Sequence, residues 1–357
     1  MPGKRSVAFA PGRVNLIGEH TDYNQGLALP FAIAAGITVR AQAVEPADTP
    51  SDARVSAYTH ELDERDEFAL ADPVPAPGWR AFVRGTVAEL ARAGFPLAGA
   101  HLEISGELPP GAGLSSSAAL EVALCLALAD LGSRSSPSKA KAVRRTEIAQ
   151  LCARVENDWV GAQTGLLDQL ASLYGAPDTA LCIDFQTLAI EPVPLRLGSW
   201  RLVVLDSGER HLHASSGYNE RRAECARACE LLGVESLRDA SSAAIEGLPE
   251  PLRRRALHVI GENERVHQAV AALRADDLVA IGRLLDASHE SLRERYEVST
   301  PAVEAAVERL RRAGAAGARV VGGGFGGSVL GLFAPDVSPP SDALEVRPGA
   351  GAHLLAL

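Results

Sequence analysis

The segment LPPGAGLSSSAALEVA, residues 108–123, joins two glycines and three consecutive serines to an apolar run. The apolar run is typical of a mostly buried helix, which we expect to begin at the serines and to end at Gly132. Because the first turn of a helix has free N–H groups and a favourable dipole, the segment predicts an anion site beside the serine hydroxyls. The same pattern is also typical of an ordinary serine-capped helix after a glycine turn.

A second glycine-rich segment, RVVGGGFGGSVLGL at residues 319–332, has five glycines in six positions between two predicted strands. Glycine costs conformational entropy in a folded chain, so packing alone does not explain this density. Close approach of the backbone to a ligand explains it, although a tight crossing between strands explains it equally well. Lysine occurs only at positions 4, 139 and 141, which excludes a Walker-type or protein-kinase phosphate site.

A third segment, PGRVNLIGEHTDYNQG at residues 11–26, begins as a strand and continues with seven consecutive hydrogen-bonding side chains. A passive turn would prefer Gly, Ser and Pro, whereas Arg, Asn, Glu, His, Asp and Tyr form directional hydrogen bonds. Such a cluster suits a ligand with many hydroxyl groups, such as a sugar. Tyr23 and Asn24 are better explained by formation of the turn itself.

The bulk composition narrows the class of protein further. The chain has 357 residues, which suggests two domains, and 46% of them are hydrophobic, as in ordinary globular proteins. A net charge of −10 argues against a nucleic-acid surface, and the apolar run 27–39 is too short to span a membrane. Five cysteines without CxxC spacing fit buried thiols in a reducing cytoplasm. We therefore expect small-molecule partners, and neither nucleic acid nor a membrane.

Together the three segments resemble the motifs of the GHMP kinases, which include galactokinase, homoserine kinase, mevalonate kinase and phosphomevalonate kinase. The serine and glycine segments indicate only this superfamily. The segment GRVNLIGEHTDYNQG is similar to the signature of the galactokinase family, which LLDQLASLYG, DSGERHLHASSGYNERRAEC and SHESLRERYEVSTPAVE also resemble. The resemblance covers nearly the whole chain, with Asp168 and Tyr218 at matching positions.

The resemblance implies an α+β GHMP kinase fold with two domains. The N-terminal domain, residues 1–195, would have an S5-like mixed sheet, and the C-terminal domain, residues 196–357, would be ferredoxin-like. The segment EPVPLRLGS is the predicted linker, and the active site would lie in the cleft between the domains. One departure is the segment SPPSDALEVRPG, which is short and weakly helical where the family usually carries a longer helix.

The implied activity is transfer of a phosphoryl group from MgATP to O1 of α-D-galactose, which gives galactose 1-phosphate and ADP and begins galactose catabolism. A GHMP kinase for a related sugar, such as N-acetylgalactosamine or L-arabinose, is the alternative. A non-catalytic galactose sensor is a further alternative, against which stand the intact GLSSSAA segment and Asp168. We expect a cytoplasmic monomer.

The resemblance also implies roles for individual residues. Asp168 would be the general base, and Arg13 would be its partner and would stabilise charge on the transferred group. The other galactose ligands would be Glu19, His20, Asp22, Gly165 and Tyr218. By its position in the chain, Arg210 could assist Arg13.

The nucleotide and the metal would lie at the serine segment. The expected ATP ligands are Gly111, Ala112, Gly113, Leu114, Ser115, Ser116 and Ser117, with Trp79 as a candidate for the adenine pocket. The cofactor would be Mg²⁺, held by Ser117 and Glu156, since this ion prefers hard oxygen ligands. Without the resemblance, Glu156 would be read as a solvated helix residue, and core packing explains Trp79 equally well.

Overall fold

The computed structural model describes residues 4–44, 53–108, 113–162, 164–209 and 214–356. Its largest sheet has six strands in the order β13-β1-β3-β6-β4-β5. Neighbouring strands are antiparallel except β4 and β6, so this is the mixed sheet that the family resemblance implies. The strands are β1 (Arg5–Asn15), β3 (Pro30–Ala43), β4 (Arg54–Thr59), β5 (Glu64–Ala69), β6 (Ala100–Gly106) and β13 (His353–Leu354).

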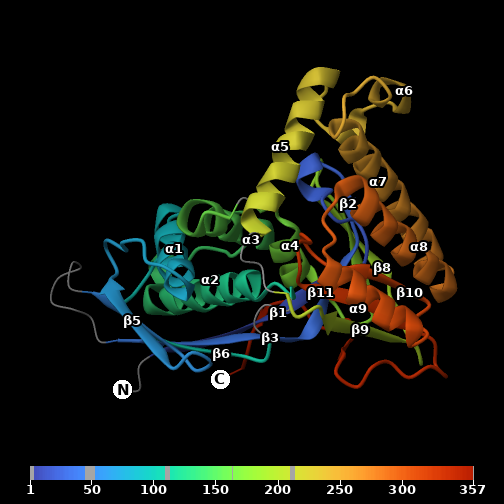
Figure 1. Cartoon of the computed structure of the whole chain (residues 1–357). Coiled ribbons are helices and arrows are strands. Elements are labelled where there is room, and N and C mark those ends of the chain that lie inside the picture. The colour runs from blue at the N-terminus through green and yellow to red at the C-terminus, as the bar shows by residue number, and fades with distance from the viewer. Residues whose placement is uncertain (1–3, 45–52, 109–112, 163, 210–213, 357) are drawn as a thin grey trace.

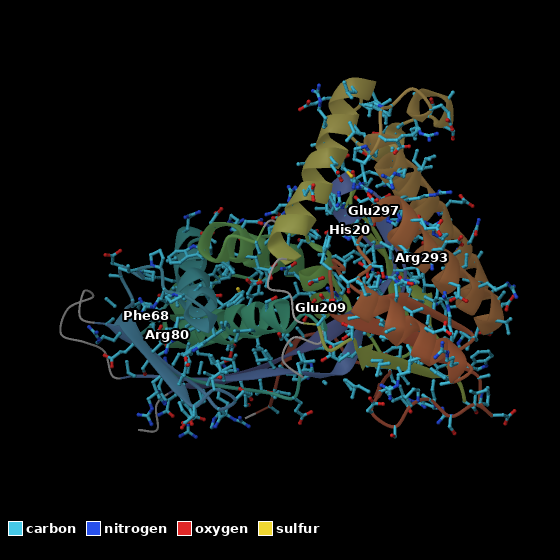
Figure 2. All side chains as sticks on the ribbon, viewed as in Figure 1. His20, Phe68, Arg80, Glu209, Arg293 and Glu297 are labelled. Carbon is cyan, nitrogen blue, oxygen red and sulfur yellow. The ribbon has the colours of Figure 1, made fainter. Side chains whose placement is uncertain are left out.

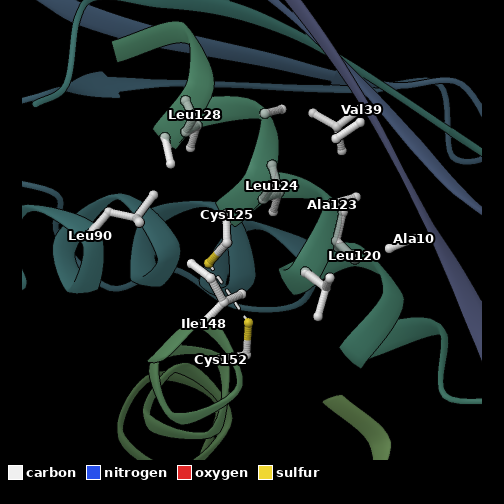
Figure 3. Packing of buried hydrophobic residues seen from close by; sticks show 14 of the residues in the cluster. Ala10, Val39, Leu90, Leu120, Ala123, Leu124, Cys125, Leu128, Ile148 and Cys152 are labelled. Carbon is white, nitrogen blue, oxygen red and sulfur yellow. Dashed lines mark hydrogen bonds between the residues drawn. The ribbon is translucent and has the colours of Figure 1, made fainter. Parts of the chain in front are cut away.

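Helices cover one face of this sheet (Figure 1). They are α1 (Trp79–Arg92), α2 (Ser116–Ser135), α3 (Arg145–Arg154) and α4 (Leu167–Tyr174), with a π-helical turn η4 (Val155–Val160) after α3. Their buried faces form one core, in which Cys125 and Cys152 face each other with sulfurs 3.7 Å apart (Figure 3). Both cysteines are free thiols, as the sequence predicts. Short 3-10 turns are η1 (Asp22–Asn24) and η3 (Pro137–Lys139).

Helix α2 begins at the serines, as predicted, but it ends later than predicted. It continues through Gly132 to Ser135. A Cβ at Gly132 would lie 1.7 Å from the carbonyl oxygen of Pro96, so this glycine allows close packing and does not stop the helix. Ser115 holds the N-cap position, but its side chain makes no capping hydrogen bond. Among the described residues, α2 is the one helix long and apolar enough to cross a membrane, and 72% of its most apolar window is buried, as in a core helix.

The C-terminal half has a four-stranded antiparallel sheet in the order β10-β11-β9-β12. Strand β11 lies between β9 and β10, and the chain between those two strands is helical. This is the split β-α-β arrangement expected of a ferredoxin-like domain. No helix connects β11 to β12, because residues 334–343 form turns and coil, in line with the predicted departure. The strands are β9 (Arg201–Asp206), β10 (Gly317–Val320), β11 (Ser328–Phe333) and β12 (Leu344–Val346).

The helices of this half project beyond the sheets as a bundle (Figure 1). The bundle is built mainly by α5, α7 and α8, and α9 packs on β10 and β11. A second π-helical turn, η6, directly follows α8. The elements are α5 (Ala214–Leu232), η5 (Leu237–Asp239), α6 (Ser242–Ile245), α7 (Leu252–Arg274), α8 (Leu278–Ser291), η6 (Leu292–Tyr296) and α9 (Pro301–Arg312).

The two halves are joined at more than one place. A small sheet of β2 (Leu27–Ala28), β7 (Thr179–Asp184) and β8 (Ala189–Pro194) packs against α7. The end of the chain returns to the first sheet, where β13 pairs with β1. We propose that the domain boundary lies near residue 195, because β8 ends at Pro194 and the second sheet begins at Arg201.

Candidate active site

A cavity of about 310 Å³ lies where segments from both halves meet. Its lining comes from the end of β1 and the polar loop after it, the segment before and into α4, the start of α5, and the glycine-rich loop after β10. All the galactose ligands expected from the sequence line this cavity. The lining residues are Arg13, Glu19, His20, Asp22, Ala162, Thr164, Gly165, Leu167, Asp168, Tyr218, Asn219 and Gly322 to Gly324.

Arg13 and Asp168 form a bidentate ion pair at one wall of the cavity. Arg13 Nε donates to Asp168 Oδ1 over 2.7 Å, and Nη2 donates to Oδ2 over 2.9 Å. The Ser115 hydroxyl also donates to Oδ2, which explains why this side chain does not cap α2. Asp168 lies in the first turn of α4. The arginine side chain is 9% exposed and the aspartate side chain 26%, so the carboxylate is the partner that a ligand can reach.

Local backbone geometry brings Arg13 to the serine segment. The register of β1 against β3 shifts between Pro11 and Arg13. The Arg13 amide donates to the Leu114 carbonyl over 3.0 Å, and its Nη1 donates to the Gly113 carbonyl over 2.8 Å. A Cβ at Gly12 would lie 2.6 Å from the same Leu114 oxygen. Glycine at this position is therefore required for the contact between β1 and the segment before α2.

Glu19 is buried, and its Oε1 joins the polar loop to the glycine-rich loop. Oε1 accepts a hydrogen bond from the Gly322 amide over 2.8 Å and another from Arg319. Burial raises the pKa of Glu19, while the positive charges of Arg319 and Arg13 oppose this shift. One carboxylate oxygen of Glu19 is thus used inside the protein, in addition to the role as a sugar ligand that the resemblance implies.

His20 lies between α5 and α7 in Figure 2, in a group of aromatic rings. Its backbone has a positive φ of 60°, a conformation that is uncommon for a non-glycine residue and is concentrated at functional sites. The Asn24 side chain stabilises this turn by donating to the His20 carbonyl over 2.9 Å. Burial, with a smaller contribution from His258, lowers the pKa of His20 to about 3, so its imidazole is neutral.

Asp22 and Gly165 are in direct contact. A Cβ at Gly165 would lie 2.1 Å from Asp22 Oδ2, so any larger residue would displace the carboxylate. Burial, reinforced by the negative charges of Asp168 and Glu19, raises the pKa of Asp22 to about 6. Three carboxylates therefore share this cavity, which is a typical arrangement of an active site. Tyr218, from α5, completes the wall beside the glycine-rich loop, where a Cβ at Gly323 would lie 3.0 Å from its ring.

Glu156 lies on the π-helical turn η4, an element that is often found at functional sites. Its Oε2 accepts hydrogen bonds from Thr164 Oγ1 over 2.5 Å and from Gln169 Nε2 over 3.1 Å. Burial and the nearby charge of Asp168 raise the pKa of Glu156, whereas hydrogen bonds from Thr164, Ser117 and Gln169 oppose the shift. The predicted metal ligands Ser117 and Glu156 thus lie together.

The other residues expected to bind the nucleotide differ in their exposure and in whether they lie near the cavity. Leu114 is buried and Ser116 is exposed at the N-terminus of α2. Trp79 begins α1 and does not line the cavity, and its indole N–H donates to Glu64 over 2.7 Å. Gly111, Ala112 and Arg210 lie outside the described residues. In the described part of the chain, no group of three or more His, Cys, Asp or Glu side chains could hold a metal.

Residues far away in sequence hold the polar loop in place, and the sequence did not reveal them. Glu262 Oε1, on α7, accepts hydrogen bonds from the amides of Gly18 over 3.0 Å and Glu19 over 3.4 Å. His258 Nε2 lies 3.1 Å from the Glu19 carbonyl oxygen. Arg319 is completely buried and donates to the Leu16 carbonyl over 3.1 Å. The arginine that begins the glycine-rich segment is the one available signal, because a charge inside an apolar strand needs a partner.

Comparisons with known proteins identify the family. Three family models match: the Galactokinase galactose-binding signature over residues 2–43, GHMP kinases N terminal domain over 81–176 and GHMP kinases C terminal over 269–351. The chain is 44% identical to a galactokinase of Mycobacterium tuberculosis over 338 residues, which is 92% of this chain and 88% of that protein. It is 41% identical to a galactokinase of Streptomyces coelicolor over 351 residues, 95% and 87% of the two chains.

Solved structures agree with this result. The crystal structure of Lactococcus lactis galactokinase complexed with galactose superposes with a TM-score of 0.89 at 33% identity, covering 99% of this chain and 95% of that one. A Methanococcus jannaschii mevalonate kinase has a TM-score of 0.66 at 16% identity, covering 98% and 99%, and shows the shared fold alone. The chain therefore belongs to the galactokinase family of the GHMP kinases, and its activity is that of a galactokinase.

Proposed function

We propose that Asp168 is the general base that accepts the proton of the galactose O1 hydroxyl as a phosphoryl group is transferred to it from ATP. Asp168 suits this role because its carboxylate borders the cavity while Arg13 and Ser115 fix its orientation. In a loose phosphoryl-transfer transition state the attacking hydroxyl loses its proton late, so orientation of that hydroxyl is a large part of the role.

The sugar lies against the polar loop, with Glu19, His20, Asp22, the Gly165 backbone and Tyr218 around it. These groups converge on one cavity although they come from three separate segments of the chain. Hydrogen-bonding groups held in this way discriminate among sugars, because an analogue that lacks the matching hydroxyl leaves a buried group unpaired. This constellation also orients O1 toward Asp168.

The phosphates of ATP lie at the serine segment, against the N-terminus of α2. Ser115, Ser116 and Ser117 begin this helix, where free backbone N–H groups favour an anion. Arg13 is close enough to the segment to stabilise charge on the transferred group, since it donates to the Gly113 carbonyl as well as to Asp168.

The oxygen atoms of Ser117 and Glu156 fit Mg²⁺. Burial, reinforced by the negative charge of the nearby Asp168, raises the pKa of the Glu156 carboxylate, a situation that a bound cation would relieve. Mg²⁺ commonly takes one or two protein oxygens together with phosphate and water. When bound there, the ion would neutralise charge on the phosphates, and Thr164 and Gln169 hold the Glu156 carboxylate in place for it.

The observation that carries the proposal is the bidentate pair of Arg13 and Asp168 at the wall of the sugar cavity. The test is Asp168→Asn, which preserves size and removes the charge. Turnover should fall by about 100-fold or more, with nucleotide affinity within about twofold of wild type. Asp66→Asn is the matched control, because Asp66 has a similar bidentate pair with Arg84 outside the cavity. Turnover of Asp168→Asn above about a tenth of wild type would rule out the base role.

A further inference from the structure

A chain of four hydrogen-bonding groups runs from the sugar cavity into the protein. His20 Nδ1 lies 2.8 Å from the Tyr23 hydroxyl, which lies 2.9 Å from the Tyr296 hydroxyl. The Tyr296 hydroxyl in turn lies 3.0 Å from Cys225 Sγ. The chain thus begins at a residue that lines the cavity and ends at a buried thiol on α5.

These four residues come from three parts of the fold. His20 and Tyr23 belong to the polar loop, Cys225 lies on α5, and Tyr296 ends the π-helical turn η6. The rings are also packed together: the centroids of His20 and Tyr296 are 4.7 Å apart, and those of His258 and Tyr296 are 4.3 Å apart. The hydrogen bonds therefore have a fixed geometry.

Each hydroxyl in the chain can donate only one hydrogen bond, so all the donors must point in the same direction. In one direction the thiol donates to Tyr296, Tyr296 to Tyr23, and Tyr23 to His20 Nδ1. In the other direction, His20 Nδ1–H donates to Tyr23, Tyr23 donates to Tyr296, and Tyr296 must donate its hydrogen bond to the sulfur of Cys225. Sulfur is the weakest acceptor of the four groups and neutral imidazole nitrogen is a strong one, so the first direction is favoured.

We propose that Tyr23, Tyr296 and Cys225 are positioning residues that hold His20 in the tautomer with its proton on Nε2. His20 then presents an N–H donor to a sugar oxygen. This inference rests on the proposed role of His20 as a galactose ligand. Two further observations agree with it. The imidazole is neutral, because burial keeps its pKa near 3. The buried Nε2 makes no hydrogen bond of good geometry within the described residues, and the nearby Gly323 backbone favours a proton on the ring, which agrees with an Nε2–H donor that a ligand completes.

The direct test is the ¹⁵N NMR spectrum of histidine-labelled protein, in which protonated and bare imidazole nitrogens have widely separated shifts. The chain has 9 histidines, and the His20 signals are assigned by their loss in His20→Gln. Wild type should show Nε2 protonated and Nδ1 bare. Tyr23→Phe should bring the two shifts toward each other as the tautomers mix. A protonated Nδ1 in wild type, or an unchanged spectrum in Tyr23→Phe, would overturn the proposal.

Kinetics separate positioning from a merely structural role. Loss of one hydrogen bond in the chain should raise the galactose KM by about 3- to 10-fold in Tyr23→Phe, and by less in Tyr296→Phe and Cys225→Ala. The KM for ATP should change by less than about twofold, because none of these hydrogen-bonded residues belongs to the proposed nucleotide site. Cys225→Ser keeps a donor and should restore the wild-type KM. Cys229→Ala, one turn along α5, is the control for loss of a thiol outside the chain.

The two proposals fail in different ways. If His20→Gln leaves the galactose KM unchanged while Tyr23→Phe still mixes the tautomers, the sugar role of His20 is wrong and the positioning chain stands. If His20→Gln raises that KM while Tyr23→Phe changes neither the spectrum nor the KM, the positioning chain is wrong and the sugar role stands. Equal KM values for Cys225→Ser and Cys225→Ala, both far from wild type, would also overturn the part assigned to the thiol.

Discussion

Arg13 and Asp168 lie 155 positions apart in sequence and face each other through two parallel hydrogen bonds of 2.7 and 2.9 Å. The planar guanidinium matches the carboxylate, so both donors and both acceptors are used at once. A lysine at position 13 has one compact charge and cannot make this pair. The arginine therefore fixes the orientation of the carboxylate as well as supplying charge.

Arg13→Lys should lower turnover by about 10- to 100-fold while the galactose KM changes much less. The reason is that lysine keeps the charge but can neither fix the orientation of Asp168 nor replace the planar guanidinium that we propose acts on the transferred group. Steady-state kinetics with each substrate varied will measure the split. Arg84→Lys is the control, because Arg84 makes the same kind of bidentate pair with Asp66 away from the cavity. Equal losses in the two variants would mean that the effect is a general one on folding.

Gly165→Ala should raise the galactose KM by about tenfold or more, because its Cβ would occupy the place of Asp22 Oδ2, only 2.1 Å away. The KM for ATP should stay within about twofold of wild type. Gly247→Ala adds the same methyl group at an open position, where the nearest atom lies at 3.6 Å, and should change neither KM. A wild-type galactose KM in Gly165→Ala would show that Asp22 is not needed where the structure places it.

The sequence predicted the parts of this site that local motifs carry. The polar loop of the sugar site follows from residue types that a passive turn does not prefer, and Asp168 follows from the resemblance of LLDQLASLYG to a family segment. Contacts between distant segments could not be predicted in the same way. Glu19 and Arg319, for example, are 300 positions apart, and neither letter reveals the other. Likewise, the return of β13 to the first sheet depends on tertiary pairing and not on local periodicity.

Ser117→Ala and Glu156→Gln should each raise the Mg²⁺ concentration needed for half-maximal activity, by about fivefold or more. Each variant removes one oxygen ligand that we propose for the ion. A Mg²⁺ titration at fixed, saturating ATP and galactose measures this directly. Asp158→Asn is the control for Glu156→Gln, since Asp158 is an exposed acid on the same π-helical turn. Titration curves that overlay wild type in both test variants would contradict the metal assignment.

Asp22 should make galactose use pH-dependent near pH 6. In the free enzyme its pKa is about 6, chiefly because burial disfavours the charged form. We propose that ionised Asp22 accepts hydrogen bonds from sugar hydroxyls, so kcat/KM for galactose should fall as the pH drops below about 6. This ratio reports groups of the free enzyme, which makes it the right quantity to measure. Asp22→Asn should have a lower kcat/KM without this acidic limb. An unchanged limb in the variant would assign the titration to another carboxylate.

The same raised pKa has a consequence for stability, and its sign can be worked out. Because folded Asp22 holds its proton more tightly than the unfolded chain does, protonation of this group favours folding. That contribution is complete below about pH 4, the ordinary range of an aspartate, and is lost as the pH rises through about 6. The Asp22→Asn side chain cannot ionise and does not lose this contribution. As the pH rises from about 4 to about 6, the free energy of unfolding of the variant should therefore rise relative to that of wild type. Urea unfolding of both proteins across this range measures the difference. A gap that stays constant with pH would show that Asp22 titrates normally in the folded protein.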